Sequence, residues 1–340
     1  MTTTRDKRRD GRRDGRRDRR KLLAFAALLV FPFFARAQGN TDHDEGRRVF
    51  SNVGGGVRAI RRGPQGQYYI LVAPSHVVLI FDSAGKQIGQ VPAKIEAPAA
   101  IVYGVALDVD PSGRLYVADR GGEAVNVYAA DGSLQAHVHV PAPMAVAALP
   151  DDTFAVPNAN SDSLLAVYDF RGTLLRKVGE SIPLVDDTAL NSRLNLGHLA
   201  SDNAGNLYFA FTYVPEPTVR KYDKLGYLVD EMSFGKSEEF KSATQAAQRE
   251  IARARKGAAI SPHEIISALG VDPTSQEIWL AFGDLLLHFD RDGRTISGDY
   301  TYIVRRTPLA PSFIFVEPDR LLLGSDSLGI YEFARVIPAA

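Results

Sequence analysis

The sequence predicts an all-β fold, a six-bladed β-propeller with four-stranded antiparallel blades. Residues 101–134, IVYGVALDVDPSGRLYVADRGGEAVNVYAADGSL, contain three short apolar runs, each ended by Pro, Asp or Gly residues that favour turns. This pattern recurs along the chain, and five turn glycines follow one another at intervals of 47, 40, 54 and 67 residues. These glycines are Gly85, Gly132, Gly172, Gly226 and Gly293. A period near ~40–50 residues with four strands per unit is typical of propeller blades.

Six units of strand, turn and strand can be followed in chain order. They span residues 57–91, 105–140, 145–178, 196–234, 265–303 and 312–334. The last unit has only three strands of its own, whereas residues 47–53 form a strand-like run with no local partner. We expect residues 47–53 to supply the missing outer strand, because an open ring would leave two exposed edges.

Two insertions explain the longer intervals between the glycines. Residues 180–192 are polar and are expected to form a loop. Residues 236–257, between the fourth and fifth units, contain a helix over 237–256 with Ser237 at its start. The apolar residues of this helix share one face, which we expect to pack on the propeller as a lid. They are Phe240, Ala243, Ala247, Ile251 and Ala254. A basic recognition helix is less favoured, because the charge of the segment is mixed.

The composition limits the classes of function. The chain has 340 residues, of which 45% are hydrophobic and 24% charged, as in globular proteins. Cysteine is absent, which excludes disulfides, thiolate metal sites and a cysteine nucleophile. The net charge of zero combines +8 in residues 1–37 with −8 in the remainder. An acidic body argues against a nucleic-acid partner, because binding of nucleic acid depends on neutralising phosphates.

The basic start has the three parts of a secretory signal peptide. Eleven Lys/Arg residues precede the 13-residue apolar core at 22–34, and Ala35-Arg36-Ala37 provides an A-x-A cleavage site. The core is shorter than the ~20 residues that span a bilayer, so no membrane span is expected in the mature chain. Residues 19–23 also resemble a twin-arginine signal. We therefore expect export to the periplasm or the extracellular space, with a linker at 38–46 and the propeller over 47–337. A nucleic-acid arm and an uncleaved anchor are the alternatives.

The second unit supports a comparison with a known family. Its sequence GVALDVDPSGRLYVADRGGEAVNVYAADGSL resembles the NHL repeat of six-bladed propellers. The resemblance implies an exported, bacterial-type propeller. It does not decide the activity, because propellers of this kind include hydrolases, lyases and binding scaffolds.

Candidate ligand-binding residues are expected on one face. In such a propeller, loops between the second and third strands share a face with the connections between blades, and the helix would overhang that face. The candidates there and along the channel are Tyr103, Arg120, Glu123, Asn158, Asn160, His198, Tyr213, His263, Asp284, Arg305 and Asp326. Ordinary solvation of polar loops is the competing interpretation for each of them. The acidic residues near the ends of inner strands are interpreted as turn formers. These are Asp108, Asp110, Asp202 and Asp272.

The favoured function is a scaffold that binds a ligand or a protein partner, with no cofactor and no catalytic residues. The alternative is a metal-dependent hydrolase or lyase similar to the lactonase-like propellers, which would hold Ca²⁺ or Zn²⁺ in the channel. Against it, no acidic residue is expected to face the channel, where the main polar side chains are Arg58, Tyr103, His198 and Ser312. His137 and His139 share a strand face but lack a third ligand. The motifs G-x-S-x-G and H-E-x-x-H are absent.

Overall fold

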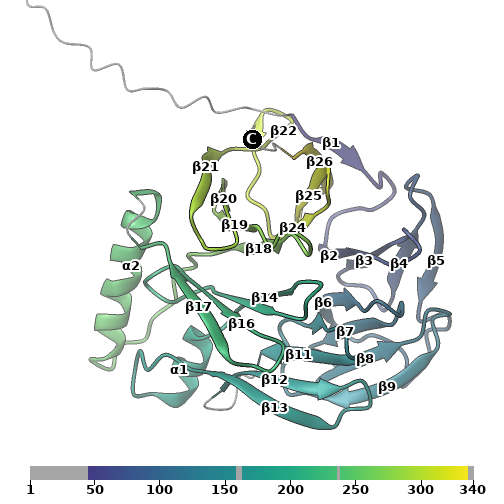
Figure 1. The fold of residues 1–340 in the computed structure, drawn as a ribbon, viewed down its shortest axis with the longest axis horizontal. Coiled ribbons are helices and arrows are strands. Elements are labelled where there is room, and N and C mark those ends of the chain that lie inside the picture. Colours follow the sequence, from purple (N-terminus) through teal and green to yellow (C-terminus); the bar gives the residue numbers. More distant parts are fainter. Residues whose placement is uncertain (1–44, 158–162, 236–237, 336–340) are drawn as a thin grey trace, which may run out of the picture. The chain divides into compact units, whose positions relative to one another are not determined.

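Six four-stranded antiparallel sheets surround a central axis in the computed structural model (Figure 1). This arrangement confirms the predicted six-bladed β-propeller. The structure describes residues 45–157, 163–235 and 238–335, all of which belong to the unit Thr41–Ala340. The predicted signal peptide lies outside the described residues. Within these ranges, no helix is both long and apolar enough to cross a membrane.

The first strand of each blade borders the axis, and the fourth lies at the outside. Blades 1 and 2 consist of β2 (Val57–Arg62), β3 (Tyr68–Val72), β4 (Val78–Phe81), β5 (Gln87–Val91), β6 (Gly104–Val109), β7 (Leu115–Asp119), β8 (Ala124–Tyr128) and β9 (Leu134–His139). Blades 3 and 4 consist of β10 (Ala147–Ala148), β11 (Thr153–Pro157), β12 (Ser163–Asp169), β13 (Leu174–Glu180), β14 (Gly197–Ser201), β15 (Leu207–Phe211), β16 (Thr218–Tyr222) and β17 (Leu228–Ser233). Blades 5 and 6 consist of β18 (Ala268–Val271), β19 (Ile278–Phe282), β20 (Leu285–Phe289), β21 (Thr295–Tyr300), β24 (Phe313–Val316), β25 (Arg320–Ser325), β26 (Gly329–Ala334) and β1 (Arg47–Val49).

The N-terminal strand closes the ring, as predicted. β1 pairs antiparallel with β26, which places Arg47 opposite Glu332 (Figure 1). The strand is shorter than expected, because the chain turns at Phe50, whose backbone has a φ of 54°. The ring of Phe50 then packs edge-on at 5.1 Å from Tyr68 and 5.2 Å from Phe81. Backbone pairing and core packing therefore both join the N-terminal segment to the blades beside it.

The apolar core consists of six clusters, one between each pair of neighbouring blades. Between blades 2 and 3, for example, the rings of Tyr116 and Phe154 lie 5.3 Å apart. The middle strands are buried on both faces, and their sequences accordingly contain continuous apolar runs such as residues 115–118. Burial of each large apolar side chain contributes about 1.5–3 kcal/mol to the stability of the fold. The clusters therefore stabilise the packing of each blade against its neighbours.

The inserted helix α2 (Glu238–Ala254) confirms the predicted helix. Phe240, Ala243 and Ala247 are buried in the cluster between blades 4 and 5, and Ile251 joins the cluster between blades 3 and 4. The Ala-rich face thus packs on the propeller, as expected. The predicted cap Ser237 lies outside the described residues.

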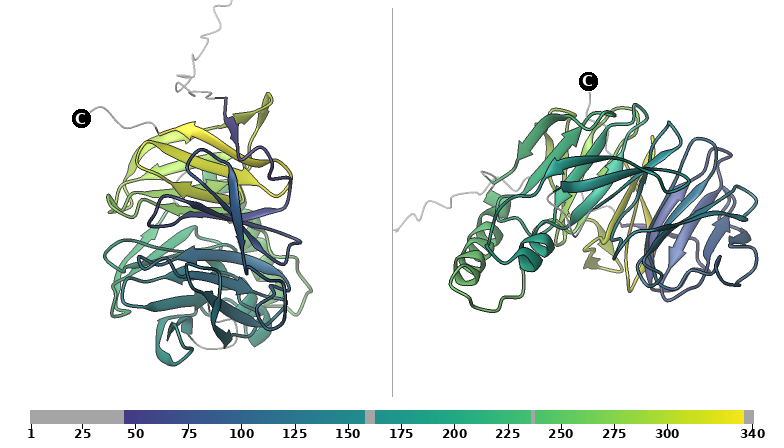
Figure 2. Two further views of the ribbon diagram at one scale, coloured as in Figure 1. Left: turned by 90° about the vertical axis from the view of Figure 1, so that its right-hand side faces the viewer. Right: turned by 90° about the horizontal axis from the view of Figure 1, so that it is seen from below.

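Two connections differ from the prediction. Residues 180–192 were expected to form a loop, but residues 188–192 belong to α1 (Thr188–Leu194). The carboxylate of Asp187 caps the start of this helix by accepting a hydrogen bond from Leu190 N. Residues 295–303 were expected to form one strand. β21 instead ends at Tyr300, and a hairpin of β22 (Ile303–Val304) and β23 (Thr307–Pro308) follows. Both helices lie on the same side of the ring (Figure 2).

Candidate functional site

The face of the interblade connections brings three polar residues together. Arg58 on β2 lies between Tyr103 and Asp326, with Nη1 2.5 Å from Asp326 Oδ2 and Nη2 3.4 Å from Tyr103 Oη. Two of the predicted residues, Tyr103 and Asp326, therefore meet at a shared arginine. The buried Asp119 supports this corner, because its carboxylate accepts hydrogen bonds from the backbone of Val102 and Tyr103.

The other predicted loop residues do not converge on this corner. Arg120 and Glu123 are exposed in the turn between β7 and β8, and Asp284 is exposed in the turn between β19 and β20. Arg305 is exposed in the β22–β23 hairpin with a φ of 51°. Asn158 and Asn160 lie outside the described residues. Arg120, Glu123, Asp284 and Arg305 are therefore exposed residues of separate turns.

The three predicted residues near the helices have separate environments. His263 is exposed, and its backbone N–H donates to Glu250 of α2 over 2.9 Å. Tyr213 packs against the cluster of blades 3 and 4, and burial raises its pKa. His198 lies on the inner strand β14, where burial lowers its pKa, and its Nε2 lies 3.2 Å from Ile266 O. Of the three, only His198 lies on an inner strand.

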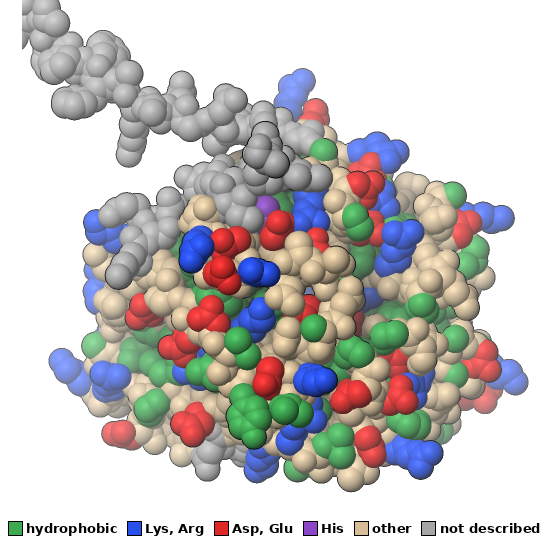
Figure 3. Space-filling view, viewed as in Figure 1, with side chains coloured by type: hydrophobic (Ala, Val, Ile, Leu, Met, Phe, Trp, Pro, Cys, Tyr) green, Lys and Arg blue, Asp and Glu red, His purple; other side chains and the backbone are tan. Residues whose placement is uncertain are grey.

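A cavity of about 580 Å³ opens at the opposite end of the channel, where the inner strands end in their first turns. Every blade contributes residues to its wall, and none of the predicted candidates is among them. Figure 3 shows the molecule hollowed near the middle of the ring, with acidic, basic and apolar side chains interspersed around the hollow. We call this cavity the turn-side mouth.

Prolines surround the turn-side mouth. In five of the six blades, the second residue after the inner strand is a proline that lines the cavity. These are Pro64, Pro111, Pro150, Pro273 and Pro318, and Asn203 takes the same position in blade 4. A proline has a fixed φ and no side-chain polar atom, so the rim is rigid and largely apolar. The proline that follows the inner strand in five of the six units is the signal in the sequence that could have identified the mouth.

Asp108 corrects an expectation from the sequence. It was interpreted as a turn former, but it lies on the inner strand β6 and lines the cavity. Its Oδ1 accepts a hydrogen bond from Nε of Arg61 over 3.0 Å, and its Oδ2 accepts one from Ala148 N over 2.9 Å. Burial raises the pKa of this carboxyl, while Arg61 and the backbone donors oppose the shift. An acidic group therefore does face the channel, bound to residues of blades 1 and 3.

The other inner-strand acids do form turns. Oδ1 of Asp110 accepts from the N–H groups of Ser112 and Arg114, which encloses Gly113 at a φ of +86°. Burial opposes ionisation of Asp110, but the bonds from Ser112 and Arg114 outweigh it and lower the pKa. Asp202 and Asp272 accept equivalent backbone bonds in blades 4 and 5. The prediction holds for these three aspartates.

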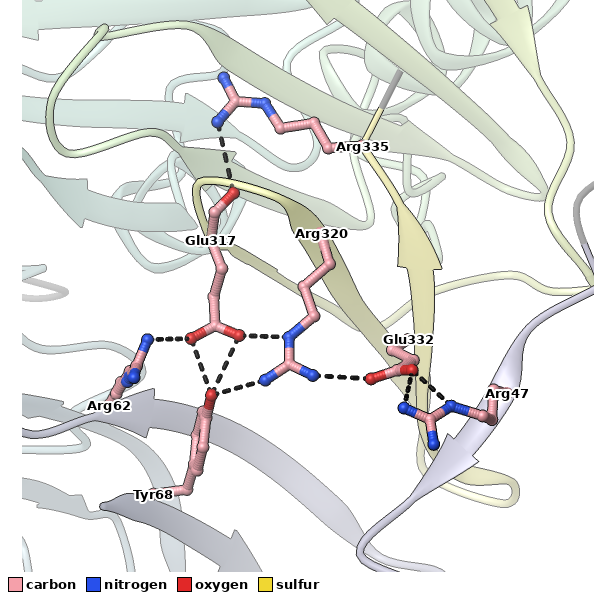
Figure 4. A network of polar contacts seen from close by, with 7 residues as sticks. All are labelled: Arg47, Arg62, Tyr68, Glu317, Arg320, Glu332 and Arg335. Carbon is pink, nitrogen blue, oxygen red and sulfur yellow. Dashed lines mark hydrogen bonds and ion pairs between the residues drawn. The ribbon is translucent and has the colours of Figure 1, made fainter. Parts of the chain in front are cut away.

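Blade 6 has Glu317 at this position, in a network that joins it to blade 1 (Figure 4). The hydroxyl of Tyr68 donates to Glu317 over 2.8 Å, and Arg62 and Arg320 donate to its two carboxylate oxygens over 3.2 and 2.6 Å. Arg320 also donates to Glu332, which pairs with Arg47 of the closing strand. The contacts between blade 6 and blade 1, where the ring closes, therefore form one side of the turn-side mouth.

The described ranges contain no cluster of three or more His, Asp or Glu side chains placed to hold a metal ion. His137, which was weighed as a metal ligand, instead has Nδ1 2.7 Å from Asn126 Oδ1 on the neighbouring strand.

Comparisons with known proteins agree with the geometry at the level of the fold. No protein-family profile and no curated protein matches the sequence. Solved structures do match: virginiamycin B lyase from Staphylococcus aureus has a TM-score of 0.54 at 10% identity over 82% of this chain and 80% of its own. A streptogramin B lyase has a TM-score of 0.56 at 9% identity, over 83% of this chain and 94% of its own. The chain shares their fold.

A propeller of another kind matches about as well. The β-propeller domain of Cps50 (Swd1) from Myceliophteria thermophila has a TM-score of 0.52 at 10% identity, covering 87% of this chain and 99% of its own. At such identities the likeness concerns the architecture of the blades and not the residues of a site.

Proposed function

We propose that this protein is a binding propeller whose small-molecule ligand occupies the turn-side mouth. The observation that carries the proposal is the cavity itself, since residues from all six blades line a single space of about 580 Å³. This volume lies within the range of roughly 300–1,000 Å³ that is usual for pockets of small ligands. The predicted role of the central channel is retained, while the ligand is assigned to the end opposite the interblade connections.

The absence of cysteine provides a direct test. An Asn203→Cys variant carries a single thiol on the rim of the mouth, and modification with a bulky maleimide would obstruct the opening. Arg120→Cys is the matched control, because Arg120 is exposed on the face of the interblade connections. Saturation-transfer NMR of a fragment library against both modified variants then compares the two ends of the channel.

The proposal expects fragments that bind the unmodified protein to lose their signal when the thiol at position 203 is modified. The same fragments should bind normally when the thiol at position 120 is modified. The opposite pattern would assign the ligand to the face that the sequence indicated, with Tyr103 and Asp326 as contacts. Retention of binding in both modified variants would contradict both assignments.

A metal-dependent hydrolase or lyase of the lactonase-like propeller type is the second candidate. One observation favours catalysis in the channel, because the carboxyl group of Asp108 lines the cavity and burial raises its pKa. A carboxyl group with a raised pKa is suited to act as a general acid or base. Elemental analysis of the mature protein tests the metal, and a stoichiometric Ca²⁺ or Zn²⁺ would favour this candidate over simple binding.

We further propose that the protein acts after export, as the pattern of residues 1–37 indicates. Cell fractionation followed by N-terminal sequencing should find a mature chain that begins near Gln38. Recovery of the full-length chain in the cytoplasm would contradict it.

A further inference from the structure

We propose that the ligand of the turn-side mouth is an organic anion with an apolar, ring-containing body, and that Arg62 binds its anionic group. This inference rests on the proposed function, because it names the ligand class of the same cavity. The carboxylates of the cavity wall already accept hydrogen bonds at their oxygens, whereas the arginines of the wall have N–H groups left to donate.

The wall offers an apolar surface to the body of the ligand. The prolines of five blades form the rim, and the ring of Phe315 lies deeper, half-buried on the inner strand of blade 6. The guanidinium carbon of Arg61 lies 5.8 Å from the centre of this ring. Proline and phenylalanine side chains favour flat apolar groups, since such groups displace water from rigid apolar walls without losing hydrogen bonds.

Most acidic groups of the wall already have a full set of hydrogen-bond donors. Glu317 accepts bonds from Tyr68, Arg62 and Arg320, and its side chain is only 3% exposed. Asp110 accepts bonds from Ser112, Arg114 and Tyr116 at 1% exposure. Asp202 accepts four bonds within its own blade. Buried carboxylates with a full set of donors have little capacity left for a ligand. Asp108 differs, because the hydrogen bonds recorded for it in the described part of the chain come only from Arg61 and Ala148, at 14% exposure of its side chain.

The basic groups are more accessible. The side chain of Arg62 is 45% exposed, and the only hydrogen bond recorded for it within the described residues is the one from Nη1 to Glu317. Arg61 is 23% exposed and uses Nε and Nη1 for Asp108 and Ile60 O. A guanidinium carries five N–H donors in a planar fork that matches carboxylates, sulfonates and phosphates. The accessible charge of the mouth is therefore positive and is concentrated on blade 1.

Two dyes with the same rings but different charge test this inference. 8-Anilinonaphthalene-1-sulfonate is an aromatic anion, and N-phenyl-1-naphthylamine has the same ring systems without the sulfonate. Fluorescence titrations of the mature protein measure both affinities. The Asn203→Cys variant with its maleimide shows which part of the binding occurs in the mouth.

Arg62→Gln is the decisive variant, and Arg47→Gln is its control. Both remove one positive charge from the network of Figure 4, but only Arg62 lines the cavity. Arg62→Gln should weaken binding of the sulfonate in the mouth at least about tenfold, since hydrogen bonds to charged groups are lost. It should change binding of the uncharged amine less than about twofold, and Arg47→Gln should change neither.

Sulfonate binding in the mouth that is unaffected by Arg62→Gln would overturn the assignment of an anion but leave the proposed function intact. An amine that binds in the mouth as tightly as the sulfonate would do the same. If neither dye binds in the mouth, the inference about the ligand class is wrong. The fragment screen then decides separately whether the cavity binds small molecules at all.

Discussion

The guanidinium of Arg47 donates to the carboxylate of Glu332, although 285 residues separate them in the chain. Arg47 belongs to β1 and Glu332 to β26, and the two residues face each other in the ladder that closes the ring. Through Arg320 and Tyr68 the same network reaches blade 1. One continuous set of polar contacts therefore links the strand pair that closes the ring to the residues on one side of the turn-side mouth.

Deletion of residues 38–53 should lower the melting temperature of the mature protein by several degrees. The deletion removes the ladder with β26 and exposes the apolar surface that Phe50 and Val53 cover. Differential scanning calorimetry measures the shift. As a control, Arg47→Ala should have a much smaller effect, because its side chain is 75% exposed and exposed ion pairs contribute little. An unchanged melting temperature of the deletion variant would contradict the closure by β1.

Tyr68→Phe should lower the free energy of unfolding by about 2 kcal/mol, because the hydroxyl bonds to two charged groups in a buried position. Urea denaturation of the wild type and the variant measures the difference. Tyr103→Phe is the matched control, since Tyr103 is exposed and its hydroxyl receives only a long contact from Arg58. Equal losses in the two variants would show that the Tyr68 hydroxyl has no special role.

The stability of the protein should fall as the pH is lowered through about 6.5, partly because of His288. Its ring is buried against Trp279, and burial lowers its pKa despite the bond to Glu277. Below its unfolded pKa the unfolded chain binds a proton that the folded chain does not bind, so the stability present above about 6.5 is lost toward the folded pKa.

His288→Phe keeps a ring on Trp279 but does not titrate. Urea midpoints at pH 8 and pH 5.5 should therefore differ less for His288→Phe than for the wild type. A smaller pH dependence should remain in the variant, because burial also lowers the pKa of His198. Parallel losses in both proteins would show that His288 does not contribute.

Phe240→Ala should release α2 from the propeller. The Phe240 ring is fully buried and lies 4.9 Å from the ring of Phe282, so truncation costs about 3–5 kcal/mol of packing. Limited proteolysis should then cut within residues 238–254 faster than in the wild type. Arg253→Ala, an exposed change on the same helix, should be cut at the wild-type rate. Equal rates for Phe240→Ala and the wild type would contradict the docking of α2.

The sequence predicted the blades because their signals are local. Asp, Pro and Gly form each turn within a few residues, and the strands between turns are short apolar runs. α1 was missed because it is short. Its seven residues contain only one buried side chain, Leu194, and one partly buried apolar side chain, Leu190, which is too few to establish a helical period. The closing strand was predicted differently: the last unit has only three strands of its own, and an open ring would leave exposed sheet edges.

The site was harder to predict because its contacts are distant in the chain. Asp108 resembled a turn residue next to Asp110, but its partner Arg61 lies 47 residues earlier, on the neighbouring blade. Likewise, each proline of the rim could be explained by the turn in which it lies, so none of them indicated a binding site. The ring of prolines becomes apparent only when the six blades are aligned on the last residue of each inner strand.

A crystal structure of the mature protein with a bound fragment or a co-purified ligand would show directly whether the ligand binds in the turn-side mouth. We expect electron density among Phe315, Arg61 and Arg62, inside the rim of prolines. Density beside Arg58, Tyr103 and Asp326, with the turn-side mouth filled only by water, would contradict it.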